Sequence, residues 1–236
     1  MGSNKYRKVI SAKPTSFQRT RGMKPPAKGI LIATEGEVTE PVYFAEVKRL
    51  LNLPTVEVEV AGCGIGDPRA LAEKALELQK RRRKAAKDDQ ISYMQVGDFD
   101  EIWIVFDTDI PLQHGKLHDG LQFATSKKIL SAHSTPCFEY WLLLHLDRTT
   151  APMAKCENVI PRLREKLGKP YSKNGEETKA LMPTFAKILK IAEDNAVWVR
   201  KQHTTGGTEF PCNPSTEVDR LIAAIRKAGC PANQDA

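Results

Sequence analysis

The sequence of 236 residues predicts an α/β protein in which a mainly parallel β-sheet is flanked by helices and followed by a C-terminal helical appendage. Residues 29–34 (GILIAT) and 101–106 (EIWIVF) are apolar runs that have the length of buried strands and are too short for helices. Helical patterns separate the expected strands along the chain, and this alternation is typical of a parallel sheet. Residues 151–200 contain helical patterns with no strand pattern between them, which predicts the appendage.

The first half of the chain is expected to form two strand–helix pairs. The first strand leads through a tight turn into a helix at residues 39–51, which has acids in its first turn and bases in its last, as the helix dipole favours. Residues 55–60 (TVEVEV) alternate between apolar and charged side chains, which indicates a strand near an edge of the sheet. Asp67-Pro68 then provides a capping side chain and a first-turn proline for a helix that includes residues 70–84.

The second half is expected to add two strands and several helices. Residues 101–109 include the most hydrophobic strand, which is therefore the expected centre of the sheet. Residues 113–127 are expected to be helical, and residues 128–134 (KILSAHS) to form a strand. Prolines after Thr135 and Asn213 repeat the pattern of Asp67-Pro68 and predict that helices begin there. Four further helices are expected, at residues 137–146, 158–168, 177–194 and 215–228.

The net charge of +7 is carried by the N-terminal segment. Residues 1–28 contain eight Lys and Arg and no acid, so the other 28 bases and 29 acids leave the rest of the chain at −1. A weakly ordered basic arm suits a polyanion such as nucleic acid, whose phosphates release counterions on contact; the alternative is a solubilising tail. The candidate nucleic-acid contacts are Arg19, Arg21, Lys24, Arg81, Arg82 and Arg83. The last three end the helix at residues 70–84, where a solvated helix terminus is the alternative.

The cysteines and the apolar runs bear on the compartment. The five cysteines are odd in number, far apart and without a C-x-x-C pair, so the sequence indicates buried or idle thiols rather than a disulfide framework or a zinc ribbon. No apolar run approaches the roughly 18 residues of a membrane helix, and the N-terminus lacks the apolar stretch of a signal peptide. We therefore expect a soluble, cytoplasmic protein with no membrane contact.

Two of the expected strands end in acidic residues. The first strand leads to Glu35, and the strand at residues 101–106 leads to Asp107 and Asp109. Ligands of open α/β sheets collect outside the carboxyl ends of the strands, so neighbouring strands would bring these carboxylates together and raise their pKa values unless a cation neutralises them. In a continuing strand, Asp107 and Asp109 would share one face and could bind one Mg²⁺ or Mn²⁺, while Thr108 points away. The alternative is that the aspartates only end a strand and start a turn.

The other candidate residues carry weaker signals. Glu139 and His145 lie six residues apart in FEYWLLLH and would project to different faces of a helix. The helix dipole favours Glu139 near a helix start whether or not it has a function. His114 and His118 have metal-ligand spacing but no H-E-x-x-H context, which indicates surface histidines. The GCGIGDP segment lacks the G-K-[ST] ending of a P-loop, so nucleotide hydrolysis by this chain is not expected.

The acidic motifs resemble a known fold and a known family. Glu35-Gly36 after one apolar strand and Asp107-x-Asp109 after a later one resemble the topoisomerase-primase (TOPRIM) fold, whose motifs are a strand-end Glu followed by Gly and an Asp-x-Asp. Four ordered blocks, ILIATEGEVTEPVYF, IWIVFDTD, STPCFEYWLLLH and NPSTEVDRLI, resemble the RloB-like family of bacterial defence proteins over residues 19–225. The resulting expectation is a flexible basic arm, a TOPRIM-like Rossmannoid core and a helical appendage, at residues 1–28, 29–146 and 147–236.

The resemblance also implies the site. It makes Glu35, Asp107 and Asp109 the metal-binding and catalytic acids, with Glu40 an additional ligand and Mg²⁺ or Mn²⁺ the cofactor. The family is similar to the overcoming-lysogenization-defect nucleases, in which such acids support metal-dependent phosphodiester cleavage. The motif E-G-E-V-T-E of this chain is one residue longer than the E-G-x-T-E of those nucleases.

The expected function follows from the resemblance. The chain would be a Mg²⁺-dependent nuclease that acts on DNA or RNA, including tRNA, as the effector of an antiviral, abortive-infection system with an AAA- or ABC-type ATPase partner encoded nearby. One alternative is a nucleic-acid-binding or regulatory subunit whose acids bind a metal without cutting. Another is a phosphatase or nucleotidyl transferase for small nucleotides, because the same acids serve any phosphoryl group. Association into a homo-oligomer stays open.

Overall fold

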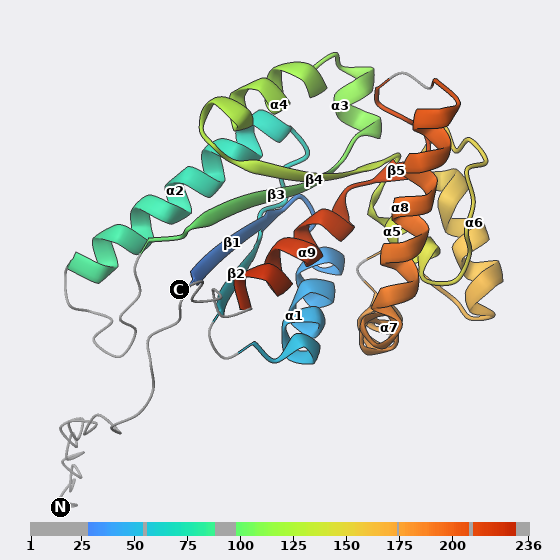
Figure 1. Ribbon diagram of the computed structural model, residues 1–236, viewed down its shortest axis with the longest axis horizontal. Helices are drawn as coiled ribbons and strands as arrows, with labels where there is room; N and C mark the ends of the chain where they lie inside the picture. Colours follow the sequence, from blue (N-terminus) through green and yellow to red (C-terminus); the bar gives the residue numbers. More distant parts are fainter. Residues whose placement is uncertain (1–27, 54–55, 88–97, 174, 208–209, 230–236) are drawn as a thin grey trace, which may run out of the picture.

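The centre of the protein is a five-stranded sheet with the strand order β2-β1-β3-β4-β5 (Figure 1). The computed structural model describes residues 28–53, 56–87, 98–173, 175–207 and 210–229. Strands β1 to β4 are parallel, and the short β5 is antiparallel to β4. The strands are β1 (Lys28–Thr34), β2 (Val56–Gly62), β3 (Glu101–Asp107), β4 (Leu130–Thr135) and β5 (Ser215–Thr216). The predicted α/β fold with a mainly parallel sheet is confirmed, with β3 at the centre and β2 at an edge.

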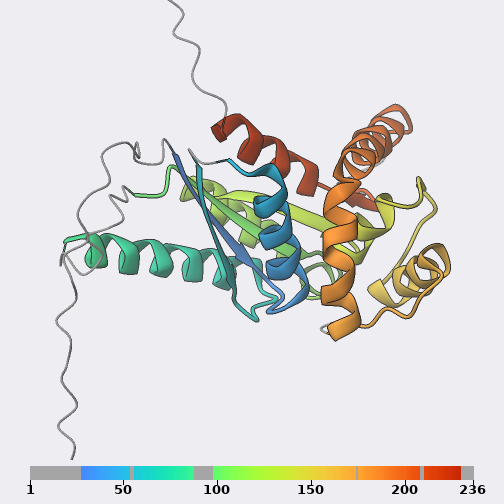
Figure 2. The ribbon, with the colours of Figure 1, turned by 90° about the horizontal axis from the view of Figure 1, so that it is seen from below.

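Nine helices of the described residues surround the sheet. Helices α2 and α4 cover one face and α1 and α9 the other, while α5 to α8 gather beyond the carboxyl ends of the strands (Figures 1 and 2). No helix in this described part of the chain is both long enough and apolar enough to cross a membrane. The helices are α1 (Thr39–Leu51), α2 (Pro68–Lys87), α3 (Asp109–Gln113), α4 (Leu117–Ser126), α5 (Phe138–Leu144), α6 (Cys156–Leu167), α7 (Glu176–Lys187), α8 (Leu189–Thr205) and α9 (Val218–Gly229).

Two hydrophobic clusters lie on opposite faces of the sheet because successive strand residues point to opposite sides. In β1, Leu31 and Ala33 face the cluster under α2 and α4, and Ile30 and Ile32 face the cluster under α1 and α9. The second of these clusters continues without interruption into α6, α7 and α8. The helices beyond the sheet therefore share a core with the sheet. This shared core holds the loops that connect these helices against the carboxyl ends of β1 and β3.

The structure corrects two expectations about where elements end. Strand β3 ends at Asp107 and does not continue to Asp109, because Thr108 takes a helical conformation (φ −97°, ψ −13°) and α3 begins at Asp109. The Thr108 hydroxyl donates a hydrogen bond to Thr135 Oγ1 at 2.9 Å, which holds this turn. The single helix expected at residues 177–194 is two helices, α7 and α8, which meet at Ile188 (φ −106°, ψ 22°).

The two prolines expected to begin helices do not do so. Cys137 is extended (φ −152°, ψ 170°), so α5 begins at Phe138 rather than at the preceding proline. The residues after Asn213-Pro214 pair with β4 as β5, so α9 begins only at Val218. Both of these X-Pro bonds are cis.

The expectation of buried or idle thiols rather than disulfides is wrong for two of the cysteines. Cys137 and Cys156 form a disulfide, with Cα atoms 5.4 Å apart. Cys137 precedes α5 and Cys156 begins α6, so the disulfide links these helices. Among the described residues, Cys63 has no disulfide partner, and Cys230 lies outside them. Only the fold brings the pair together, because 19 positions separate the two cysteines and no short motif connects them.

Candidate metal centre

Two acids lie at the carboxyl ends of neighbouring strands: Glu35 directly follows β1, and Asp107 is the last residue of β3. The strand ladder pairs Thr34 with Val105 and extends to Glu35, whose N–H donates to Val105 O at 2.8 Å. The N–H of Asp107 donates to Glu35 Oε2 at 2.9 Å. The two acidic strand ends are therefore neighbours, as the sequence predicts, and Glu35 contacts the backbone of Asp107 directly.

The Asp107 carboxylate is buried and oriented from both sides. Its Oδ1 accepts a hydrogen bond from the N–H of Phe138, the first residue of α5, at 2.8 Å. Its Oδ2 lies 3.6 Å from Lys173 Nζ. One oxygen thus has a fixed backbone partner, and the other is open apart from a distant cation.

Glu40 reaches the same site from the first turn of α1. Its Oε1 accepts a hydrogen bond from the N–H of Gly36 at 3.2 Å. A Cβ at position 36 would lie 2.1 Å from Glu40 Oε2, so only glycine permits this approach of carboxylate to backbone. The additional residue in the E-G-E-V-T-E motif therefore does not remove Glu40 from the site.

Glu139, in the first turn of α5, is held by residues from the loop between α6 and α7. Tyr171 donates its hydroxyl proton to Glu139 Oε1 at 3.0 Å, and Lys173 Nζ lies 3.0 Å from Glu139 Oε2. Cys156 Sγ also lies 3.0 Å from Oε2, but a disulfide sulfur carries no hydrogen, so this is a close contact without a hydrogen bond. Sequence reasoning missed Tyr171 and Lys173, because a tyrosine and a lysine in a polar loop carry no motif.

These side chains surround a cavity of about 100 Å³. The residues that line it are Glu35, Gly36, Thr39, Glu40, Asp107, Phe138, Glu139 and Lys173. Thr39 is only 4% exposed, and its hydroxyl has no hydrogen-bond partner in the described part of the chain. The Tyr171 hydroxyl lies near Thr39 but donates its proton to Glu139. A buried hydroxyl without a partner at a cavity wall is the feature that a bound ligand would satisfy.

Burial and mutual repulsion raise the pKa values of the acids in the cavity. Burial is the main reason why the pKa of Glu35 rises to about 7; the charges of Glu40 and Asp109 raise it further, while the Asp107 N–H and Lys173 oppose the rise. Burial also raises the pKa values of Glu40 and Asp107. The nearby carboxylates raise the pKa of Lys173 although burial opposes this. The ionised acids are therefore short of positive charge.

Asp109 lies outside the lining of this cavity. It begins α3, and its Oδ1 accepts a hydrogen bond from the N–H of Ile110 at 2.8 Å. The expectation that Asp107 and Asp109 share one strand face fails because the strand ends between them. The Asp109 charge nevertheless contributes to the raised pKa of Glu35, so Asp109 belongs to the surroundings of the site.

The donor set of the cavity fits a hard divalent cation: carboxylate oxygens, the Thr39 hydroxyl and too little positive charge. The carboxylates are not drawn together as a ready-made cage. Among the described residues, the group whose ligand atoms all lie within 4.8 Å of one another is Cys137, Glu139 and Cys156, and the disulfide occupies both sulfurs. A cation bound by the acids of the cavity therefore requires their side chains to close around it.

The remaining sequence candidates lie elsewhere. His145 is buried between Tyr43 and Trp141: its Nε2 is 3.1 Å from the Tyr43 hydroxyl and its Nδ1 is 3.0 Å from Trp141 O. Burial lowers the pKa of His145 to about 4, so this histidine is a neutral core residue at neutral pH. His114 follows α3 and His118 lies in α4; both are exposed, in agreement with the expectation of surface histidines.

The basic candidates divide into two groups. Arg19, Arg21 and Lys24 lie outside the described residues. Arg81, Arg82 and Arg83, on the last turns of α2, each contact an acid. Arg81 pairs with Glu77, Arg82 with Glu57 and Glu59, and Arg83 with Asp98.

The fold and the cavity together define an α/β protein with an acidic site at the carboxyl edge of a parallel sheet. The model of the family described as RloB-like protein matches residues 30–225. The chain belongs to the RloB-like family, which confirms the family predicted from the four sequence blocks. No curated protein and no solved structure matches the chain.

Proposed function

We propose that this RloB-like protein is a metal-dependent nuclease whose TOPRIM-like centre is the cavity at the ends of β1 and β3. The observation that carries the proposal is an imbalance of charge. Glu35, Glu40, Asp107 and Glu139 line one cavity together with a single cation of the described residues, Lys173. Buried carboxylates in excess are costly unless they are protonated or neutralised by a cation. A divalent ion that binds phosphate is the neutralising ligand that suits these oxygens.

The residues divide the work as follows. Glu35, Glu40 and Asp107 would hold the ion from inside the cavity, with the Thr39 hydroxyl as a neutral oxygen donor, and Asp109 would add negative charge from outside. When bound, Mg²⁺ or Mn²⁺ would act as a Lewis acid for a phosphodiester oxygen and lower the pKa of an attacking water. Glu35 is held in place by the Asp107 N–H, and its pKa of about 7 without metal allows it to exchange a proton at neutral pH.

The proposed substrate is nucleic acid, either DNA or RNA. Residues 1–28 carry eight bases and no acid, which supports contact with a polyanion. The resemblance to defence proteins supports a role as the effector of an antiviral system, with an ATPase partner that provides the nucleotide hydrolysis for which this chain lacks a P-loop.

The test is a cleavage assay with the full chain, with and without the ATPase encoded nearby. Plasmid DNA and total tRNA are incubated in Mg²⁺ or in EDTA. Asp107→Asn removes one negative charge but keeps an oxygen that can accept the Phe138 N–H, so the fold should survive. We expect cleavage in Mg²⁺ and none in EDTA. The cleavage rate of the variant should be lower by roughly 100-fold or more, which is the scale seen when one charge-stabilising group is removed from an active site.

The matched control is Asp119→Asn, which neutralises an exposed aspartate that pairs with Arg69 and does not line the cavity. This variant should cleave like the wild type. Full activity of Asp107→Asn would refute the assignment. Binding of either nucleic acid without any cleavage, in the presence of Mg²⁺ and the ATPase, would instead favour the binding or regulatory subunit.

A further inference from the structure

The Lys173 side chain lies close to two of the acids of the cavity, Glu139 and Asp107. It lies in the loop between α6 and α7, and its ammonium group is 3.0 Å from Glu139 Oε2 and 3.6 Å from Asp107 Oδ2. Glu139 is itself held by the Tyr171 hydroxyl from the same loop. The loop between two appendage helices thus delivers a positive charge to acids that come from the sheet and from α5.

The hydrogen bonds of the cavity leave a specific set of oxygens open. Glu35 Oε2, Glu40 Oε1 and Asp107 Oδ1 each accept a backbone N–H. Both oxygens of Glu139 are engaged, one by Tyr171 and the other by Lys173. Within the described residues, the oxygens that receive no hydrogen bond from another residue are Glu35 Oε1, Glu40 Oε2, Asp107 Oδ2 and the Thr39 hydroxyl oxygen.

We propose that the site takes one divalent cation per chain and that the Lys173 ammonium supplies the second positive charge. The inference rests on the proposed function, which it deepens. Three carboxylate oxygens and a hydroxyl are enough for one Mg²⁺ or Mn²⁺, because these ions keep several water ligands. A second ion, which in two-metal sites lies about 3.5–4 Å from the first, would need Glu139 as a further ligand. Lys173 and Tyr171 already occupy that carboxylate.

The experiment counts bound Mn²⁺ with the purified full chain, by calorimetry and by the electron paramagnetic resonance signal of free Mn²⁺. We expect one ion per wild-type chain. Lys173→Met frees Glu139 Oε2 as a further ligand and removes the positive charge beside Asp107 Oδ2, so this variant should bind two ions. In the double variant Lys173→Met with Glu139→Gln the additional ligand is removed again, and one ion should bind.

Two further variants separate charge from general effects of substitution. Lys173→Arg keeps the positive charge and should bind one ion. Lys179→Met, on α7, removes a lysine of nearly equal side-chain exposure (41%, against 42% for Lys173) that pairs with Glu176 instead, and should also bind one ion.

The possible outcomes distinguish this inference from the function on which it rests. Two Mn²⁺ ions per wild-type chain would overturn the inference and leave a metal-dependent nuclease intact; this measurement does not depend on whether Lys173→Met folds. One ion in a folded Lys173→Met chain, with unchanged affinity, would overturn it as well. No Mn²⁺ binding together with no cleavage would instead contradict the proposed function.

Discussion

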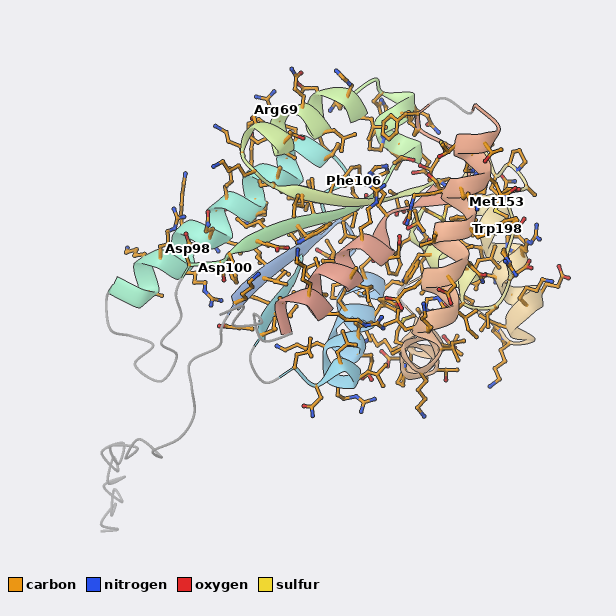
Figure 3. All side chains as sticks on the ribbon, in the orientation of Figure 1. Arg69, Asp98, Asp100, Phe106, Met153 and Trp198 are labelled. Carbon is orange, nitrogen blue, oxygen red and sulfur yellow. A yellow bond between two sulfur atoms is a disulfide. The ribbon has the colours of Figure 1, made fainter. Side chains whose placement is uncertain are left out.

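The acidic cavity and the basic end of α2 are both concentrations of charge, but they are neutralised to different degrees. At the end of α2, Arg82 contacts Glu57 at 2.7 Å and Glu59 at 3.2 Å. Arg83 pairs with Asp98, which Figure 3 places at the start of β3, whereas Phe106 lies toward the other end of that strand. The two charge clusters therefore belong to opposite ends of the sheet.

The two clusters differ in whether the chain itself supplies the neutralising partners. Each arginine at the end of α2 meets a carboxylate of the chain itself, so the cluster is close to neutral and needs no outside partner. In the cavity, four carboxylates share Lys173, and burial raises the pKa values of three of them, Glu35, Glu40 and Asp107. At low pH, protonation of these carboxylates takes the place of a neutralising cation.

Glu35→Gln should have the largest effect on stability, and the effect should depend on pH. The folded protein keeps the Glu35 proton to about pH 7, whereas the unfolded chain releases it near its ordinary value of 4.5. The contribution of Glu35 to stability without metal is therefore fully present below pH 4.5 and is lost as the pH rises from 4.5 to 7. Glutamine does not ionise and can still accept the Asp107 N–H. At pH 8 without metal, the variant should be more stable than the wild type by about 3 kcal/mol.

Urea unfolding at pH 4.5 and pH 8, each with EDTA and with saturating Mg²⁺, measures this effect. The advantage of Glu35→Gln should be nearly absent at pH 4.5. In Mg²⁺ at pH 8 it should shrink or reverse, because the wild type then gains the free energy of metal binding. Glu37→Gln, at an exposed neighbouring position, should unfold like the wild type throughout. An equal effect of the two substitutions at pH 8 would mean that burial of Glu35 is not the cause.

Arg82→Met should have the next largest effect and tests the other side of the contrast. The Arg82 side chain is only 9% exposed, pairs with Glu57 and lies 4.0 Å over the Phe99 ring. Its removal leaves a poorly exposed carboxylate without its main partner, which should cost about 2 kcal/mol of folding free energy. Arg81→Met removes a side chain that is 66% exposed and should cost about 0.5 kcal/mol or less.

Thermal unfolding of the two arginine variants, together with the salt dependence of their nucleic-acid affinity, checks this expectation. Arg82→Met should lower the melting temperature and leave the slope of log affinity against log salt unchanged, because an arginine occupied by glutamates makes no phosphate contact. A shallower salt slope without loss of stability would show that Arg82 is a nucleic-acid contact after all.

Part of the site could be predicted from the sequence because strand order and strand ends determine it. Glu35 and Asp107 both stand at the carboxyl ends of apolar strands, and the centre of a parallel sheet brings such ends together. Asp109 was beyond this reasoning. Asp109 lies two residues after Asp107, so the direction of its side chain depends on whether the strand continues. The hydrogen bond between Thr108, which follows β3, and Thr135 at the end of β4 holds a turn there instead.

The cation of the site could not be predicted from the sequence at all. Lys173 lies in a polar loop with no periodicity, 66 positions from Asp107, and it reaches the cavity because α6 and α7 pack against α5 and α1. The same packing brings Cys156 to Cys137. Contacts of this kind arise from tertiary packing. The local sequence around each of these residues is generic, so it does not indicate the distant partner.

Gly36→Ala should have the smallest effect on stability and tests whether the cavity needs the exact position of Glu40. A Cβ at this position would lie 2.1 Å from Glu40 Oε2, which is the mobile end of a side chain, so the carboxylate should turn away while the backbone stays. We expect a change of less than about 1 kcal/mol in unfolding free energy. Loss of one ligand oxygen should weaken Mn²⁺ binding on the order of tenfold, equivalent to about 1.4 kcal/mol.

Gly115→Ala, where a Cβ meets nothing within 4 Å, is the control for the cost of the substitution itself, and any cost there comes from its positive φ of 65°. Unchanged Mn²⁺ affinity in Gly36→Ala would exclude Glu40 from the ligands and leave Glu35, Asp107 and Thr39 to bind the ion.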